Sequence, residues 1–335
     1  MGIDLPLLWA IIIAFGLMMY VIMDGFDLGI GILFPFVRDR VDRDTMVNSV
    51  APVWDGNETW LVLGGAALLA VFPLAYAVIL SALYLPVVLM LAGLIWRGVA
   101  FEFRFKADEG HKAFWDKAFA WGSYVATFAQ GVALGAFING FEVKDGAYAG
   151  GPLDWFSPFS LFAGLGLLFA YALLGATWLV MKTEDRLQRK MRELGRPITL
   201  GLLVVIAVVS AWTPITHADI ADRWFSLPNL LFFAPVPILV AFATWALLKT
   251  LRGRSNAAPF LLSLLLLFLG YSGLAISLWP HIVPPDISIW QAAAPIQSMG
   301  FTLVGALFII PFILAYTAWS YYVFRGKVKS GEGYH

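Results

Sequence analysis

Two pairs of carboxylates lie in stretches of the sequence that are otherwise strongly apolar. Asp24 and Asp27 stand in "VIMDGFDLGIGIL", and Asp55 and Glu58 stand in "APVWDGNETWLVLGG". Each pair has the i, i+3 spacing that puts both side chains on one face of a helix. A charged group near the middle of a bilayer costs at least about 2.5 kcal/mol on insertion scales. Four such groups therefore need a compensating role.

Three interpretations of the four carboxylates are open at the level of sequence. The acids could pair with a basic residue or cap helix kinks at Gly25 and Gly56, because buried polar groups usually have partners. They could form a proton path, because neighbouring carboxylates are hard to ionise together and therefore share protons. With the Asn57 carbonyl, they could also hold a hard cation such as Na⁺ or Ca²⁺. A proton path built from the four carboxylates is the hypothesis that we prefer.

Further charged residues stand at the ends of two other apolar stretches. "LIWRGVAFEFRFKADEG" places Arg97 at the end of an apolar run, with Glu102 shortly after it. Arg97 is the candidate partner for an acid inside the membrane, whereas Arg104 and Lys106 are expected to anchor the chain beside anionic lipid. Asp116 opens the next apolar stretch in "FWDKAFAWGS".

The elements that must position these residues are membrane-spanning helices. Of the 335 residues, 60% are hydrophobic and only 13% are charged, which excludes an ordinary water-soluble domain. Apolar runs recur along the whole chain, so the N-terminus is interpreted as a first span and not as a cleaved signal peptide. We expect an all-α, polytopic transmembrane helix bundle that forms a single domain over residues 1–335. Its nine expected spans are roughly 6–36, 48–72, 77–96, 118–139, 157–181, 198–214, 229–248, 259–279 and 296–324.

The basic residues predict the orientation of these spans. Of the 22 lysines and arginines, 20 fall in one alternating set of loops and the C-terminal tail, and the other set holds only Lys144 and Arg223. By the positive-inside bias, the basic side is cytoplasmic. The N-terminus is therefore expected outside and the C-terminus in the cytoplasm.

Depth in the membrane relates the two acidic pairs. A second span that began after its own acids would be too short to cross the bilayer, so it is expected to begin near Asn48. Each pair then lies about 16 Å of helix away from the loop between the first two spans. If the two helices run antiparallel, Asp27 is level with Asp55, and Asp24 is level with Glu58.

Residue types that are absent exclude several kinds of chemistry. The chain has no cysteine, which excludes disulfides, thiolate metal sites and covalently attached c-type haem. Its histidines, His111, His217, His281 and His335, are all expected in loops or at span ends, so the chain alone is a poor haem carrier. No nucleotide-binding, hydrolase or metalloprotease motif stands in the right context. Neither a metal site nor a nucleic-acid partner is expected.

Several motifs, which are distributed over almost the whole chain, resemble those of a known family. They include "DGFDLGIGIL", "NSVAPVWDGNETWLVLGGAALLAVFP", "WRGVAFEFR", "SLWPHIVPPDISIWQAAAP" and "PFILAYTAWSYYVFRGKV". Together they resemble subunit II of the bacterial cytochrome bd-type quinol oxidases. The length and the WDGNETW spelling are more similar to the shorter group that includes cyanide-insensitive quinol oxidases.

The resemblance implies a heterodimeric respiratory complex in the bacterial inner membrane. In that family, subunit I carries haem b and haem d and reduces O₂ to water with electrons from quinol. Subunit II has no haem; it supports haem insertion and assembly of subunit I and helps to bring cytoplasmic protons to the oxygen site. A structural quinone, lipid contacts and a small single-helix subunit also belong to what the resemblance implies.

The family motifs also carry over individual positions. They place residues that matter for assembly or activity at Asp27, Trp54, Asp55, Arg97 and Asp116, with Glu102 at a position that is also acidic in the family. Our hypothesis for the proton path is that Asp55, with Glu58, Asp27 and Asp24, lies at the interface of the two subunits.

Two further classes of function remain open. A secondary transporter or ion channel subunit would use a midplane acidic cluster as its coupling site, but the paired broken helices of inverted repeats are not found. In a purely structural membrane partner, the acids would only bind the haem-bearing subunit.

Overall fold

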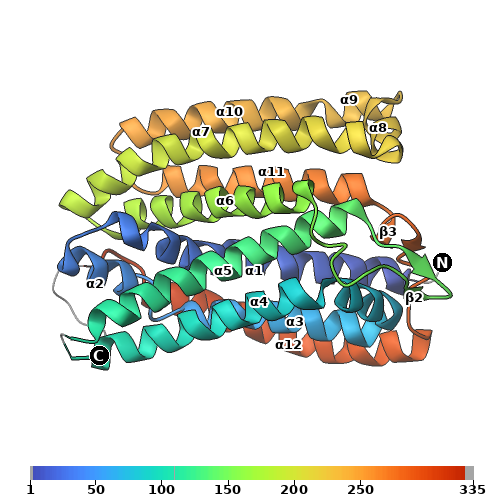
Figure 1. Cartoon of the computed structure of the whole chain (residues 1–335), viewed down its shortest axis with the longest axis horizontal. Coiled ribbons are helices and arrows are strands. Elements are labelled where there is room, and N and C mark those ends of the chain that lie inside the picture. The colour runs from blue at the N-terminus through green and yellow to red at the C-terminus, as the bar shows by residue number, and fades with distance from the viewer. Residues whose placement is uncertain (1–2, 109, 329–335) are drawn as a thin grey trace.

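Helices packed side by side make up almost the whole of the computed structural model, which describes residues 3–108 and 110–328 (Figure 1). Every expected span overlaps one long helix, which confirms an all-α, multi-helix fold. The long helices are α1 (Leu5–Leu33), α3 (Trp54–Val71), α4 (Pro73–Lys106), α5 (Lys112–Asn139), α6 (Pro158–Lys182), α7 (Asp185–Thr216), α10 (Pro235–Arg252), α11 (Ala258–Leu278) and α12 (Ile296–Val323). The short elements are η1 (Phe34–Phe36), α2 (Arg40–Asn48), α8 (Ala218–Phe225), α9 (Asn229–Phe233), β1 (Val143–Lys144), β2 (Ala147–Tyr148), β3 (His281–Val283) and β4 (Ile287–Ser288).

Seven segments in the described part of the chain are long and apolar enough to cross a membrane. They are α1 with η1, α4, α6, α7, α9 with α10, α11 and α12. Helices α3 and α5 fall outside this group, and α3 is only 18 residues long and begins with the polar sequence WDGNETW. Length and composition therefore support seven candidate spans where the sequence predicts nine.

The start of α3 corrects one expectation. The sequence predicts a span that begins near Asn48, but α2 ends at that residue, and turns over residues 49–53 lead into α3. Helix α2 is a separate element because the Asp39 side chain caps it by accepting hydrogen bonds from the backbone amides of Val41 and Asp42. The acidic pair of α3 therefore stands in its first two turns.

The long helices form two groups of four. Helices α1, α3, α4 and α5 pack on one another, and α6, α7, α10 and α11 form the second group. Helix α6 contacts both α1 and α5 and so joins the groups, while α12 packs on α3 and α1. The buried carboxylates of α1, those of Asp24 and Asp27, consequently lie inside the first group.

Small residues allow the central helices to approach closely. A Cβ atom on Gly29 of α1 would lie 1.9 Å from the Tyr171 carbonyl oxygen of α6, and one on Gly175 would lie 2.5 Å from the Gly29 backbone. Such spacing permits only glycine, as is common at helix contacts in membranes. The small residues of "GLGLLFAYALLGATW" therefore hold α6 directly against α1.

The two ends of the helices carry different structures. The antiparallel hairpins β1–β2 and β3–β4, together with α8 and α9, lie at the end where the described chain begins, and α2 lies at the opposite end (Figure 1). Lys144 on β1 and Arg223 on α8 are therefore both at the N-terminal end. This arrangement agrees with the loop alternation expected from the basic residues.

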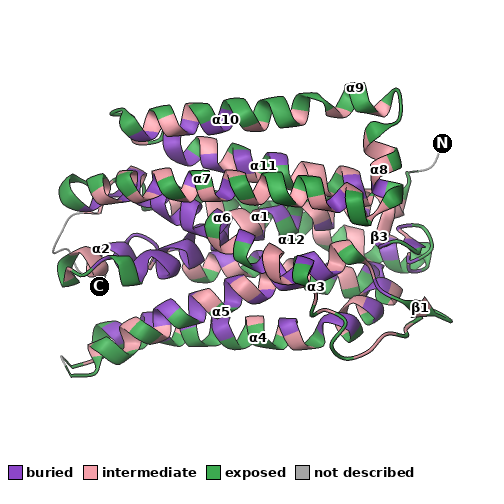
Figure 2. Cartoon of the chain, turned by 45° about the horizontal axis from the view of Figure 1, so that its top comes forward, coloured by how far each residue is buried: buried purple, intermediate pink, exposed green. Residues whose placement is uncertain are grey.

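Buried residues gather on the central helices, and the outer helices are largely exposed (Figure 2). Most of the second half of α6 is buried, whereas Met299 is the one described residue of α12 that is buried. The apolar side chains of α12 are thus available to lipid or to another protein chain.

Candidate functional site

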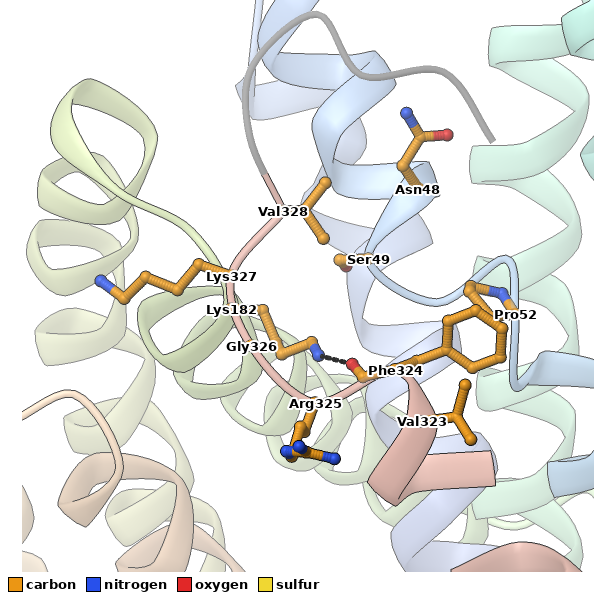
Figure 3. Close-up of a pocket in the computed structure, with 10 residues that line it drawn as sticks. All are labelled: Asn48, Ser49, Pro52, Lys182, Val323, Phe324, Arg325, Gly326, Lys327 and Val328. Carbon is orange, nitrogen blue, oxygen red and sulfur yellow. Dashed lines mark hydrogen bonds between the residues drawn. The ribbon is translucent and has the colours of Figure 1, made fainter. Parts of the chain in front are cut away.

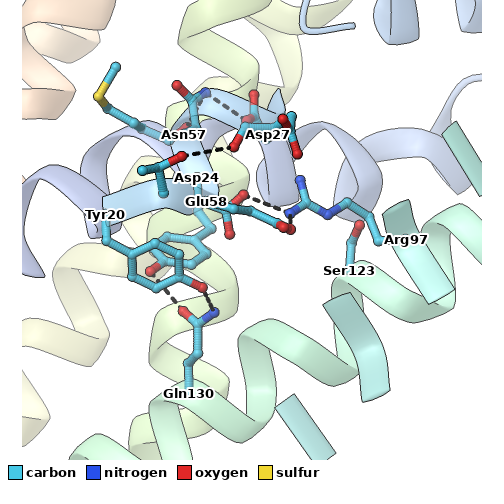
Figure 4. Close-up of polar contacts among 12 residues, drawn as sticks. Tyr20, Asp24, Asp27, Asn57, Glu58, Arg97, Ser123 and Gln130 are labelled. Atoms are coloured by element: carbon cyan, nitrogen blue, oxygen red, sulfur yellow. Dashed lines mark hydrogen bonds and ion pairs between the residues drawn. The ribbon is translucent and has the colours of Figure 1, made fainter. Parts of the chain in front are cut away.

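A buried ionic cluster lies where α1, α3 and α4 meet (Figure 4). Arg97 Nη2 of α4 donates to Asp24 Oδ1 of α1 at 2.8 Å and also pairs with the Glu58 carboxylate of α3. Arg97 and Asp24 are both 0% exposed, and 28% of the Glu58 side chain is exposed. Arg97 therefore pairs with an acid of α1, as expected, and Asp24 and Glu58 both contact the same guanidinium nitrogen.

Asp27 extends the cluster through an amide. Asn57 Nδ2 donates to Asp27 Oδ2 at 2.7 Å, and the Tyr321 hydroxyl of α12 donates to Asn57 Oδ1 at 2.9 Å. Asp27 is 0% exposed, and Asn57 is buried as well. This branch connects α1 through α3 to α12.

A second branch leads from Asp24 toward α5 and α6. Tyr20 lies one helical turn from Asp24 on α1. Gln130 Nε2 donates to the Tyr20 oxygen at 2.5 Å, and the Tyr171 hydroxyl donates to Gln130 Oε1 at 3.0 Å. Polar side chains of α1, α5 and α6 are thus linked within the apolar core (Figure 4).

The cluster contains more acids than bases. Its three carboxyl groups are those of Asp24 and Glu58, which pair with the one guanidinium group, and that of Asp27, which is bonded to Asn57. Within the described chain, Asp24 Oδ2 and Asp27 Oδ1 are buried without a hydrogen-bond partner. Because an isolated buried charge is costly, a cluster of this composition is expected to hold protons as well as charges.

Asp55 lies apart from the other three acids. It stands in the first turn of α3 and is exposed on the surface of this chain. The sequence predicts Asp55 level with Asp27, and the α3 side chain that contacts Asp27 is that of Asn57. Exposure of the acids decreases from Asp55 through Glu58 to Asp24, so the α3 pair leads from the surface inward.

Aromatic rings cover the side of the cluster that faces the start of α3. Trp54 stacks on Phe101 with ring centroids 5.1 Å apart and planes 5° apart. The Arg97 guanidinium carbon lies 5.7 Å from the Trp54 ring centroid, within reach of a cation–π contact. Trp54 and Phe101 therefore separate Arg97 from the turns over residues 49–53 that precede α3.

A second ionic network lies near α2. Asp116 of α5 accepts from Arg43 Nη1 and from Arg104 Nε, both at 2.7 Å, and Arg104 Nη1 also pairs with Asp44 Oδ1 at 2.6 Å. Arg104 is 3% exposed. Its expected role as an anchor beside lipid is therefore wrong, because the side chain turns inward to join α4, α5 and α2. Glu102 and Lys106 lie exposed on α4.

The histidines of the described chain lie at the ends of helices. His111 precedes α5, His217 stands between α7 and α8, and His281 is in β3, whereas His335 lies outside the described residues. These positions do not form a pair of axial haem ligands inside the bundle. Among the described residues, no group of three or more potential ligands is arranged to hold a metal ion.

Sequence reasoning missed four polar side chains of the site: Tyr20, Gln130, Tyr171 and Tyr321. The signal that could have found one of them was Gln130, a polar residue in the middle of the apolar stretch "ATFAQGVALGAF". The tyrosines carried no such signal, because tyrosine is common in membrane helices and at their interfaces.

Comparisons with known proteins agree with the motif resemblance. The sequence profile of the family described as cytochrome bd terminal oxidase subunit II matches residues 5–324. Cytochrome bd-I ubiquinol oxidase subunit 2 from Escherichia coli K12 is 30% identical, with 98% of this chain and 96% of that protein covered. Cytochrome bd ubiquinol oxidase subunit 2 from Bacillus subtilis 168 is 28% identical, with 97% of both proteins covered.

A solved structure has the same fold. A chain of the bd oxidase from Geobacillus thermodenitrificans superimposes with a TM-score of 0.75 at 16% identity, covering 96% of this chain and 97% of that one. The expected membership of a cyanide-insensitive group receives no support from these relatives.

Proposed function

Because the chain belongs to the family of cytochrome bd terminal oxidase subunit II, we propose that it is the haem-free second subunit of a quinol oxidase that reduces O₂ to water. Electron transfer is the chemistry that haem supplies, and the proposal assigns haem b and haem d to the partner subunit. The residues of this chain then have two tasks, to support assembly of that partner and to move protons.

The buried cluster of Asp24, Asp27, Glu58 and Arg97 is the observation that carries the proposal. Reduction of O₂ to water consumes protons, so a subunit beside the oxygen site needs groups that accept and release them. A cluster with three carboxyl groups and one guanidinium group changes its protonation more readily than a single balanced ion pair. Arg97 keeps part of this negative charge in place, and the remaining carboxylate oxygens are able to take up protons.

The order of exposure gives the order of the acids along the route. Asp55 is exposed on α3, Glu58 is partly exposed one turn further along, and Asp24 is buried behind Arg97. In the proposed route, the buried acids of α1 pass protons to Glu58. From there the protons reach Asp55 and, across the subunit interface, the partner.

The proposal also assigns the membrane topology. Nine long helices cross the bacterial inner membrane, with the N-terminus outside and the C-terminus in the cytoplasm. Helices α3 and α5 cross it although they are less apolar, because α1, α4 and α6 cover parts of their surfaces. The inner side is then the end that carries α2, where the chain is rich in arginine and lysine.

Assembly with subunit I is assigned to the outward faces of α3, α4 and α12. Asp55 lies on this side of α3, and large apolar side chains such as Phe308 and Phe312 of α12 are 76% exposed. A carboxylate on the apolar surface of a membrane protein is costly unless a polar group of a partner faces it. The Asp55 surface is therefore proposed to be the interface with the haem-bearing subunit.

The test is Asp55→Asn in the purified complex, with the haem content verified from its absorption spectrum. The proposal predicts that oxygen consumption falls by at least about tenfold while the haem bands stay normal, because an amide cannot relay a proton as a carboxyl group does. Asp108→Asn, which changes an exposed inner-loop carboxylate, serves as the matched control and should keep the wild-type rate.

A purely structural subunit is the second candidate, and the pairing of Arg97 with Asp24 favours it, because ion pairs also hold helices together. Loss of haem d in Asp55→Asn would support this structural role. Normal haem content together with the wild-type rate of oxygen consumption would contradict the proton route.

A further inference from the structure

A cavity of about 260 Å³ lies at the cytoplasmic end of the bundle, between the end of α12, the end of α6 and the segment that follows α2 (Figure 3). The residues that follow α12 form one wall and return to α6, where the backbone amide of Val328 donates to the Lys182 carbonyl at 2.8 Å. Its lining residues are Asn48, Ser49, Pro52, Lys182, Val323, Phe324, Arg325, Gly326, Lys327 and Val328. The lining thus contains three basic residues and no acidic one.

Lys182 is the buried cation of this cavity. The residue is only 8% exposed, and its Nζ donates to the Phe324 carbonyl at 2.6 Å. Nζ also lies 5.3 Å from the centroid of the Trp178 ring. No carboxylate within the described chain pairs with Lys182, although lysine is rarely buried to this degree without an anionic partner.

The other two basic residues are arranged differently. Lys327 Nζ lies 3.4 Å from Glu184, and the Arg325 guanidinium stacks over Tyr322 at 3.9 Å and donates to its carbonyl. They contribute positive potential at the rim, whereas Lys182 contributes donors inside. The ammonium group has three donor hydrogens, and the Phe324 carbonyl uses one of them.

We propose that this cavity binds a phosphate-bearing anion, the phosphate group of an anionic phospholipid or free phosphate, through the Lys182 ammonium. A buried ammonium with donors to spare and a basic rim are the features that recognise phosphate oxygens. Basic pockets between helices on the cytoplasmic side of a membrane are suited to lipid headgroups. The bound anion would link the end of α12 to α6 and to the segment before α3.

The test uses the purified oxidase complex and native mass spectrometry. Three probes are titrated separately: dihexanoyl phosphatidylglycerol, dihexanoyl phosphatidylcholine and inorganic phosphate. Binding of phosphatidylglycerol that is about tenfold weaker in Lys182→Gln than in the wild type is expected, because one charge-assisted interaction is lost. Lys249→Gln is the matched control, because Lys249 also lies over a tryptophan, Trp245 at 5.1 Å, but is exposed and far from the cavity lining.

The probes distinguish the sources of the anion. Tighter binding of phosphatidylglycerol than of inorganic phosphate identifies a lipid headgroup, and equal binding of both identifies free phosphate; either result supports the site if it depends on Lys182. Equal binding of phosphatidylcholine and phosphatidylglycerol would contradict recognition of an anion. So would equal losses of affinity in Lys182→Gln and Lys249→Gln.

A second variant guards against misfolding of Lys182→Gln. The double variant Arg325→Gln with Lys327→Gln changes two rim residues that are not fully buried, and it should weaken phosphatidylglycerol binding while leaving the haem spectrum normal. A chain that ends at Val328 should still bind the anion. If only the shortened chain bound it, the C-terminal tail with Glu332 would be the occupant and the proposal would be wrong.

Discussion

At the scale of single residues, the site is defined by the positions of Asp24, Asp27, Asp55 and Glu58 relative to Arg97. The sequence could predict the acids and their cation, because charged side chains are conspicuous in apolar helices and need partners. It could not predict that Asp55 faces away from the others. That outcome depends on the rotation of α3 about its axis, which brings Asn57 to Asp27.

Replacement of Arg97 tests the charge balance of the cluster. Arg97→Gln leaves the buried Asp24 and the partly exposed Glu58 without their cation, and we expect a loss of stability of about 3–5 kcal/mol. The measurement is the temperature at which the purified complex loses its haem absorbance. Lys106→Gln, an exposed change on the same helix, should shift that temperature little.

A compensating change makes the same prediction sharper. Adding Asp24→Asn to Arg97→Gln removes one of the uncompensated carboxylates and should recover part of the lost stability. If Arg97→Gln were as stable as Lys106→Gln, the ion pair would not stabilise the cluster.

At the scale of elements, the long helices were predictable and their contacts were not. Apolar runs predicted every long helix, because burial in a bilayer demands such runs. Helix α7 begins 13 residues before its expected span and α4 ends 10 residues after its own, because both helices continue into polar sequence. The boundary at Asn48 was wrong because the Asp39 cap starts a separate helix, α2, that ends there. The branch from Tyr20 through Gln130 to Tyr171 depends on how α1, α5 and α6 pack. Helix packing of this kind cannot be predicted from one sequence.

The cap of α2 should respond to pH. Hydrogen bonds from the backbone amides of Asp42 and Val41, together with Arg186 nearby, lower the pKa of Asp39 below its ordinary value. A lowered pKa means that this stabilisation is present above the ordinary carboxyl pKa of about 4 and is lost as the pH falls through the lowered pKa. Burial raises the pKa of Asp42, which acts in the opposite direction.

Hydrogen exchange of the α2 amides between about pH 6 and about pH 3 measures this effect, after correction for intrinsic rates. Protection of α2 in the wild type should fall at the acid end. Asp39→Asn should keep the cap and lose this pH dependence, whereas Asp39→Ala should lower protection throughout. A fall in protection that was the same in Asp39→Asn would assign the effect to another group.

At the scale of the whole molecule, two four-helix groups are joined through α6, and α12 lies outside them against α3. The alternation of basic loops predicted which ends of the helices lie together, and the described structure places Lys144 and Arg223 at the N-terminal end. The division into two groups could not be predicted, because it depends on close contacts such as that between Gly29 and Gly175.

The proposed orientation can be tested with single cysteines, because the chain has none of its own. In cells whose inner membrane is intact and whose outer layers let small reagents through, Lys144→Cys should react with a membrane-impermeant maleimide added outside. Lys106→Cys should react only after the inner membrane is opened. The reverse pattern of labelling would show the opposite topology. Asp55 would then lie nearer the outer side of the membrane, away from the cytoplasmic protons.

The central claim is that the buried cluster carries protons to the oxygen site. The most direct test is to reconstitute the Glu58→Gln complex in proteoliposomes and to measure its proton uptake while it reduces oxygen. Glu58 is the partly exposed acid between Asp55 and Arg97, so we predict uptake and oxygen consumption lowered by at least about tenfold with an unchanged haem spectrum. Glu193→Gln, which changes an exposed glutamate of α7, should behave as the wild type. Wild-type proton uptake in Glu58→Gln would contradict the claim.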